Sequence, residues 1–214
     1  WFVEESRIKR GFNNTSVDFG VKAYIVEEEA SQTRRQSSLI YSGVYNAKNG
    51  INNTNEFPIG EDITRSVDPA SGSIQKLYAE NTNLVIFQER KVNRAPIDKD
   101  VIFTQEGQPL NSDSRLVIGT PSAFEGNFGI SRDPGSFAVY GYNKYFTDRD
   151  RGVAMQLGPN GLTEISNFGM IDYFRDALNT STFTGIVGGY DVYQKNYVCT
   201  IETQTLVFDD LIKD

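Results

Sequence analysis

The feature that most constrains the fold is the stretch from Ser136 to Ser166, in which four short apolar segments alternate with turn sequences. The four strands that it predicts are Phe137–Gly141, Tyr145–Asp148, Val153–Leu157 and Leu162–Ile165. Asn160-Gly161 joins the last two, and Asn-Gly is the strongest short signal for a hairpin. Four antiparallel strands in about 30 residues form a meander of the size of one propeller blade. The stretch therefore predicts a β fold, although by itself it gives no function.

Similar turns recur along the chain near residues 90, 143 and 195, at intervals of 53 and 52 residues. This spacing, with several strands in each unit, indicates propeller blades or another β-repeat array. We therefore predict an all-β, propeller-like repeat of four-stranded antiparallel units with one short helix, which at this length can be a partial propeller. The hairpins Leu84–Ala95, Phe137–Asp148 and Tyr190–Ile201 should then superpose with similar strand order. The alternative is a β-sandwich whose hairpins are evenly spaced.

Two regions follow from this pattern. Residues 1–20 mix charge, Asn and Gly with isolated aromatic residues, and we expect an extended arm there. Residues 21–214 are expected to form the repeat domain, beginning with a strand at Val21–Val26. The chain starts at Trp1 without an initiator Met, which suggests a piece of a longer polypeptide.

The other expected elements are strands and one helix. The expected strands are Leu39–Tyr45, Ile74–Ala79, Leu84–Phe87, Val92–Ala95, Val101–Thr104 and Arg115–Gly119, the last two flanking the loop Gln105–Ser114. Pro96 lacks an N–H group, so the strand before it should end there or lie at a sheet edge. The helix is expected at Asn167–Leu178, with Ser166 or Asn167 as its N-cap. Its apolar stripe is Met170, Ile171, Phe174 and Leu178, and its solvent face is Asp172, Arg175 and Asp176.

Composition excludes several functions. The chain has no His, a single Cys and a net charge of −7. The absence of His removes the usual general base and metal ligand, and an acidic chain lacks the basic footprint that nucleic-acid binding needs. No apolar run approaches the length of a membrane span. Cys199 lies within Tyr197–Ile201 and is expected to be a small buried residue, consistent with assembly in a reducing cytoplasm. We predict no enzyme, cofactor, metal, nucleic acid or membrane span.

Two patterns of acidic residues would indicate a metal site or an enzyme instead. Asp148-Arg149-Asp150-Arg151-Gly152 resembles the start of a calcium loop, but no acidic residue completes it and a charged hairpin turn is favoured. Asp148, Glu164 and Asp172 are carboxylates that a glycoside hydrolase would pair, but nothing in the sequence sets their separation.

Four stretches of the chain resemble large virion structural proteins of tailed bacteriophages, especially marine phages. The stretches are EESRIKRGFNNTSVDFGVKAYIVEEE, the segment from LIYSGVYNAKNG to APIDKD, the segment from SFAVYGYNKYFTDRDRG to GMIDYFRD, and GGYDVYQKNYVCTI. Parts of these also look like propeller blades of phage tail-tube, nozzle and muzzle components. The resemblance implies a non-enzymatic structural component of the virion, in the tail, neck or baseplate region, assembled in the host cytoplasm with other virion proteins as an oligomer or part of a larger assembly. The alternatives are a module that binds a host-surface glycan and a glycoside hydrolase-like propeller.

Two segments, Trp1–Gly20 and Asn46–Ser73, have too few apolar residues to form their own core. Such segments gain order by lying on another subunit, or else are mobile surface loops. We predict that they make the intermolecular contacts and that the helix does not. The candidate contact residues are Trp1, Phe2, Phe12, Phe19, Ile51, Phe57, Ile59 and Ile63.

Overall fold

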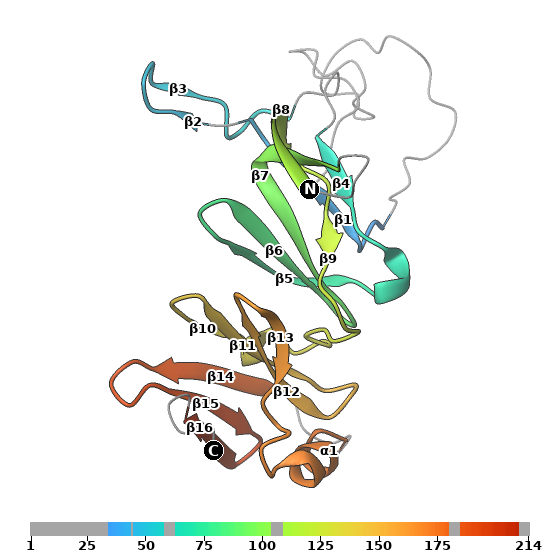
Figure 1. Cartoon of the computed structure of the whole chain (residues 1–214), viewed down its shortest axis with the longest axis vertical. Helices are drawn as coiled ribbons and strands as arrows, with labels where there is room; N and C mark the ends of the chain where they lie inside the picture. Colours follow the sequence, from blue (N-terminus) through green and yellow to red (C-terminus); the bar gives the residue numbers. More distant parts are fainter. Residues whose placement is uncertain (1–33, 44, 58–62, 104–108, 180–184, 210–214) are drawn as a thin grey trace, which may run out of the picture. The chain divides into compact units, whose positions relative to one another are not determined.

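The computed structural model describes residues 34–43, 45–57, 63–103, 109–179 and 185–209 (Figure 1). Antiparallel strands dominate, and the one α-helix of these ranges lies near the C-terminal end, which confirms the all-β prediction. The chain divides into two compact units, residues 1–66 with 97–120, and residues 67–96 with 121–214. The expected arm at residues 1–20 and the expected strand Val21–Val26 lie outside the described residues.

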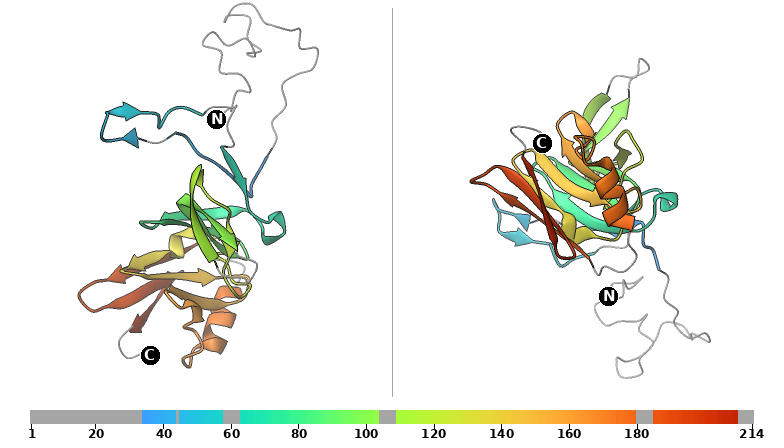
Figure 2. Two further views of the ribbon diagram at one scale, coloured as in Figure 1. Left: turned by 45° about the horizontal axis from the view of Figure 1, so that its top comes forward. Right: turned by 90° about the horizontal axis from the view of Figure 1, so that it is seen from below.

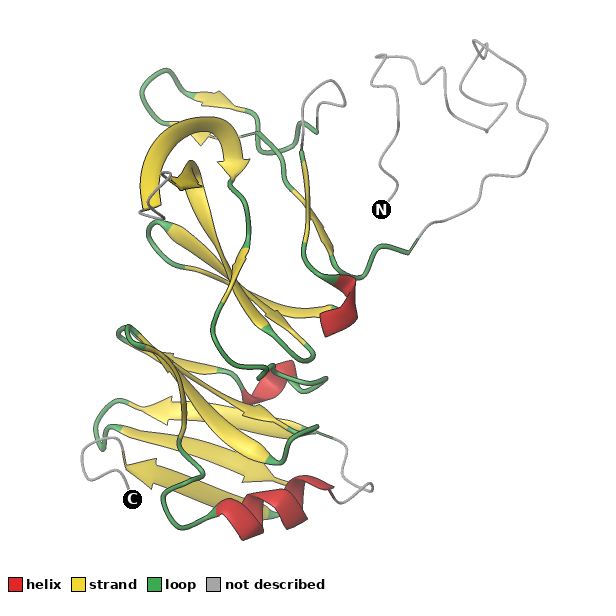
Figure 3. Cartoon of the chain, turned by 45° about the vertical axis from the view of Figure 1, so that its right-hand side comes forward, coloured by secondary structure: helices red, strands yellow, loops and turns green. Residues whose placement is uncertain are grey.

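The first unit consists of short paired strands. Its pairs are β1 (Ser38–Ile40) with β4 (Thr64–Ser66), β2 (Tyr45–Asn46) with β3 (Ile51–Asn52), and the second half of β7 (Val92–Phe103) with the curved β8 (Pro109–Ile118) (Figure 3). The expected strand Leu39–Tyr45 is wrong as one element, because the chain leaves β4 after Ile40 and the Gly43 amide donates to the Glu56 carbonyl at 3.0 Å. The expected loop Gln105–Ser114 is also too long, since β8 already begins at Pro109.

The second unit begins with a sheet in the order β5-β6-β7, with β9 on the far side of β7. The new strands are β5 (Ile74–Ala79), β6 (Asn83–Gln88) and β9 (Ser122–Ala123). The strand before Pro96 was expected to end there or to lie at a sheet edge. It does not end at Pro96 but continues to Phe103. Besides β6, the strand pairs with β9 up to Arg94 and with β8 from Ile97 onward. Pro96 pairs with neither β9 nor β8, so its missing N–H group is tolerated there.

Two further sheets follow in the second unit. The four-stranded sheet is β10 (Ala138–Tyr140), β11 (Asn143–Asp148), β12 (Val153–Gly158) and β13 (Gly161–Glu164), in sequence order. This meander is confirmed strand for strand, and Gly161 has the positive φ of 108° that its hairpin turn requires. The three-stranded sheet is β14 (Ile186–Asp191), β15 (Asn196–Ile201) and β16 (Gln204–Asp209).

The helix α1 (Ile171–Asn179) is shorter than expected at its N-terminal end. The expected capping residue Ser166 uses its hydroxyl elsewhere, accepting from the Ala154 amide at 3.3 Å and donating to Glu164 at 3.2 Å. Phe174 and Leu178 are buried as expected, but Met170 and Ile171 are exposed, so only half of the predicted apolar stripe packs. The expected solvent face of the helix is confirmed.

The predicted repeat is out of register by one hairpin. The turns near 143 and 195 both follow the first strand of their sheets, whereas the turn near 90 joins β6 to β7 and follows the second strand. The second strands of the three sheets begin at Asn83, Asn143 and Asn196, and are therefore 60 and 53 residues apart. The Leu84–Ala95 hairpin therefore corresponds to β11 and β12 rather than to β10 and β11.

A polar clamp accompanies the first two sheets of this unit. An Asp-Pro sequence opens a short 3-10 turn before β5 (Pro69–Ser71) and again before β10 (Pro134–Ser136). A fully buried polar residue ends the second strand of each sheet and holds the incoming connection. Gln88 donates to the Asp68 and Gly72 carbonyls at 2.9 and 2.8 Å. Asp148 accepts from the Gly129 amide at 3.0 Å and from the Ser131 hydroxyl at 2.9 Å.

The core of the second unit lies on both faces of the middle sheet. Figure 2 shows the ribbon of this sheet between those of the other two. Neighbouring residues of a strand point to opposite faces, and Tyr145 and Phe146 of β11 are both fully buried. Phe146 packs with Phe87 of the preceding sheet, at 5.2 Å between ring centroids. Tyr145 packs with Tyr197 of the following sheet, at 5.1 Å, in a cluster that also includes Phe174 of α1. The three sheets are therefore stacked in chain order.

We expect the stability of this core to fall at alkaline pH. Burial raises the pKa of the Cys199 thiol from 9.0 to about 11, with a smaller opposing effect from the Tyr197 hydrogen bond. Burial also raises the pKa of Tyr197 well above its ordinary value. Both groups hold their protons more tightly in the folded chain. The contribution of Cys199 is complete below pH 9 and is lost as the pH rises to about 11, and the contribution of Tyr197 is complete below pH 10 and falls only above it.

The measurement is urea unfolding at a series of pH values. The free energy of unfolding should fall above pH 9, by up to about 1.4 kcal/mol per pH unit for each group. Cys199→Ala should lower the stability at neutral pH but flatten the alkaline fall. A wild-type profile that stays level from pH 9 to 11 would contradict the assignment.

Candidate functional site

Four tyrosine rings form a continuous stack across the second and third sheets. Tyr140 of β10 stacks on Tyr190 of β14 with 4.4 Å between ring centroids and 8° between planes. Tyr190 in turn stacks on Tyr145 at 5.4 Å, and Tyr145 on the buried Tyr197 at 5.1 Å. Such contacts stabilise beyond the area that they bury. The stack therefore fixes the ends of β10 and β14 side by side.

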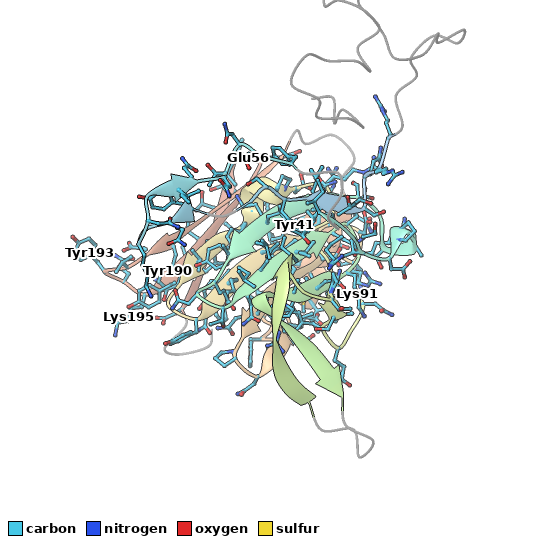
Figure 4. All side chains as sticks on the ribbon, turned by 90° about the horizontal axis from the view of Figure 1, so that it is seen from above. Tyr41, Glu56, Lys91, Tyr190, Tyr193 and Lys195 are labelled. Atoms are coloured by element: carbon cyan, nitrogen blue, oxygen red, sulfur yellow. The ribbon has the colours of Figure 1, made fainter. Side chains whose placement is uncertain are left out.

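The hairpin turns that follow β10 and β14 each carry a further tyrosine, whose side chain lies in solvent. Tyr142, in the first turn, is 80% exposed, and Tyr193, in the second, is 99% exposed. Figure 4 shows Tyr190, Tyr193 and Lys195 together at one margin of the molecule, with Tyr193 pointing outward. We call Tyr140, Tyr142, Tyr190 and Tyr193 the tyrosine tip.

Local hydrogen bonds hold the two turns in place. The Asp191 carboxylate accepts from the amides of Tyr193 at 2.8 Å and Gln194 at 3.2 Å, and Lys195 adopts a left-handed φ of 58°. In the other turn the Lys144 ammonium, which is nearly buried, donates to the Tyr142 carbonyl at 3.0 Å and pairs with Glu80. Burial lowers the pKa of Lys144. The tip is thus preorganised, and ordering it on binding costs little entropy.

A polar hollow of about 660 Å³ lies between the β11–β12 turn and the end of α1. Its charged lining is Arg90, Arg149, Asp150 and Arg151. Each arginine lies near a carboxylate of the clamp or the turn, Arg90 at 3.9 Å from Asp150, Arg149 at 3.9 Å from Asp133 and Arg151 at 3.3 Å from Asp148. Burial raises the pKa of Asp133, and its repulsion with Asp150 adds to this against the opposing charge of Arg149. We assign these arginines to the structure of the clamp.

The acidic patterns of the sequence fall at structural positions. Asp148 is a buried part of a charged hairpin turn, as favoured over a calcium loop. Glu164 ends β13 and Asp172 lies on the exposed face of α1, so the three carboxylates belong to separate elements. Within the residues that the structure describes, no three His, Cys, Asp or Glu side chains gather as metal ligands. No helix in those ranges is long and apolar enough to cross a membrane.

The candidate contact residues are spread over different environments. Ile51 is exposed on β3, Phe57 is half-buried, and Ile63 is buried beside β4. Trp1, Phe2, Phe12, Phe19 and Ile59 lie outside the described ranges. Sequence reasoning missed the tyrosine tip, although Tyr140-Gly141-Tyr142 and Tyr190-Asp191-Val192-Tyr193 both place a second tyrosine in a predicted turn. That repetition was the available signal.

Comparison with known proteins adds no family. No protein-family model matches the chain, and no curated protein matches it significantly.

Proposed function

We propose that the chain is a non-enzymatic structural component of a tailed-phage virion, in the tail, neck or baseplate region, where it acts through subunit assembly. The three sheets of the second unit would be successive blades of a propeller-like array. The observation that carries the proposal is the middle sheet, whose adjacent residues Tyr145 and Phe146 are fully buried against the following and preceding sheets. Serial stacking of this kind is typical of repeat arrays, in which each unit is stabilised by its neighbours.

The polar clamp supports the same proposal. Its repetition before β5 and β10 fixes how the chain enters each sheet, and it uses buried hydrogen bonds that specify one arrangement. A rigid part that must fit a particle requires such fixed geometry.

The tyrosine tip favours one alternative, a module that binds a host-surface glycan. Exposed aromatic rings beside amide and carboxylate side chains are suited to sugars, and Tyr142 and Tyr193 lie beside Asn143 and Asp191. The same residues suit a protein contact equally well, because tyrosine is enriched where interfaces concentrate their binding energy. The assembly proposal assigns the tip to another virion subunit.

The test of the function is fractionation of a lysate of cells infected with the phage that encodes the chain. Immunoblotting should find the chain in density-purified particles, in constant ratio to the major tail protein. Detection only in the soluble fraction would overturn the proposal. A glycan array probed with the purified chain tests the alternative. A glycan-binding module requires specific binding that is lost when Tyr142 and Tyr193 are replaced by Ala.

We expect the double substitution Tyr142→Ala, Tyr193→Ala to leave folding intact but to reduce incorporation into particles at least about tenfold. Both side chains are largely in solvent, so the free energy of unfolding should change by less than about 0.5 kcal/mol each. The matched control is Val187→Ala, which removes an exposed apolar side chain of β14 outside the tip and outside the predicted contact segments. Incorporation of the double variant at the wild-type level would remove the tip from the assembly contacts.

A further inference from the structure

Strand β16 is an edge strand without the protection that the other edges of the second unit carry. β5 has an irregular register between Ile74 and Lys76 and a charged side chain there. β13 is four residues long and starts at a glycine with positive φ. β14 is covered by the 3-10 turn at Pro134–Ser136. Bulges, charges, short length and covering elements are the usual means of preventing edge-to-edge pairing.

By contrast, β16 is six residues long and in unbroken register with β15. No second strand pairs with it among the described residues. Its centre, Leu206-Val207-Phe208, is continuously apolar and carries no Lys, Pro or bulge. The neighbouring four-stranded sheet has β13 in the corresponding fourth position. The third sheet therefore presents a regular apolar edge where its neighbour has another strand.

An apolar cavity of about 170 Å³ lies beside this edge. Its lining includes Leu206, Val207 and Phe208 of β16, the buried Tyr197 and Cys199 of β15, and Phe168 and Met170, which are both partly exposed. Leu206 and Phe208 pair with Cys199 and Tyr197 of β15, which also line the cavity, so the cavity lies under the inner face of the third sheet, on the side of β16. A strand added here would bring side chains over the cavity and bury Phe168 and Met170 further.

We propose that β16 pairs antiparallel with β16 of a second copy of this chain, joining two three-stranded sheets into one. We choose a second copy because the apolar residues of β16 face apolar residues when two copies of this strand pair antiparallel. Facing residues in an antiparallel pair lie on the same face of the sheet. The two copies therefore keep their buried faces together only if the residue numbers of each facing pair add up to an even number. The register centred on Val207 satisfies this and places Val207 opposite Val207 of the second copy.

In that register every central position is apolar on both strands. Leu206 faces Phe208 of the second copy on the cavity side, and the reverse pair forms by symmetry. Val207, which is 55% exposed in the single chain, faces its own copy on the outer side. A register centred on Leu206 would instead place Gln204 opposite Phe208. The pairing is a two-fold, isologous contact that closes at a dimer.

The test is sedimentation velocity of the full 214-residue chain over a wide range of protein concentration. The expected result is a reversible monomer–dimer equilibrium that strengthens with salt, because each copy carries a net charge of −7. Val207→Lys should weaken dimerisation at least about tenfold, since the two lysines would face each other. The matched control Val187→Lys, on the same outer face of β14 and 68% exposed, should dimerise as the wild type does.

A mixed sample tests the register itself. Val207→Lys and Val207→Glu should each be monomeric alone but should dimerise when mixed, because opposite charges then face each other. Circular dichroism and thermal unfolding must show all variants folded. A wild-type chain that stays monomeric at every concentration would overturn the proposal, even if β16 pairs with a strand of another protein. So would an unchanged Val207→Lys dimer, or a Lys–Glu mixture that fails to recover dimers. None of these results depends on where the chain acts in a particle.

Discussion

Replacing Asp148 by Ala is expected to lower the free energy of unfolding by about 3–4 kcal/mol. The carboxylate is fully buried and accepts hydrogen bonds from the Gly129 amide, the Ser131 hydroxyl and the Arg151 amide, at 3.0, 2.9 and 3.3 Å. Its removal leaves the buried Gly129 amide and Ser131 hydroxyl without an acceptor, which costs more than the net value of the bonds. The Arg151 guanidinium also loses its partner at 3.3 Å.

Urea unfolding of Asp148→Ala and Asp148→Asn provides the comparison. Asn keeps one carbonyl oxygen and the shape of the side chain but no charge, so its loss should be about half as large. The surface variant Asp172→Ala, on the exposed face of α1, controls for the loss of an acidic residue and should stay within about 0.5 kcal/mol of the wild type. If Asp148→Ala proves as mild as Asp172→Ala, the clamp does not hold the connection to β10.

The second large effect is expected at the junction between the second and third sheets. A Cβ atom added at Gly188 of β14 would meet the Ser136 carbonyl oxygen at 2.0 Å, a clash with backbone that no side-chain rotation relieves. Gly188→Ala should therefore lower the free energy of unfolding by about 3 kcal/mol, the upper part of the range for overpacking. The same approach lets the Tyr197 hydroxyl donate to that carbonyl at 2.7 Å, a bond that separation of the sheets would break.

The adjacent residue offers a matched control. Gly189 lies in the same strand, and a Cβ added there meets no atom within 4 Å. Gly189→Ala should change stability by less than about 0.5 kcal/mol. Thermal and urea unfolding of the two variants measure the difference directly. Equal stabilities would show that the contact between β14 and the 3-10 turn is not maintained in solution.

Local signals predicted the meander and the hairpins well. The apolar segments from Phe137 to Ile165 and the turn at Asn160-Gly161 were sufficient, because antiparallel neighbours joined by short turns depend on nearby residues. The buried Phe174 and Leu178 of α1 were likewise visible in the spacing of the sequence. The start of the helix was not, because the Ser166 hydroxyl binds β12 and β13 instead of capping the helix.

Features that depend on distant residues were out of reach. The continuation of β7 past Pro96 depends on its pairing with β8, from Ile97 to Phe103. The error in the repeat arose because turn chemistry alone does not tell the first hairpin of a sheet from the second. The tyrosine tip depends on the packing of β10 against β14, which joins residues 50 positions apart, Tyr140 and Tyr190.

The most direct test of the proposed role is an electron cryo-microscopy map of a tailed-phage particle whose genome carries the sequence of this chain, which the proposal requires to exist. We expect density for the three stacked sheets, in the order of the chain, in the tail, neck or baseplate, with Tyr142 and Tyr193 against another subunit. A map of the complete particle in which no density fits these sheets would contradict it.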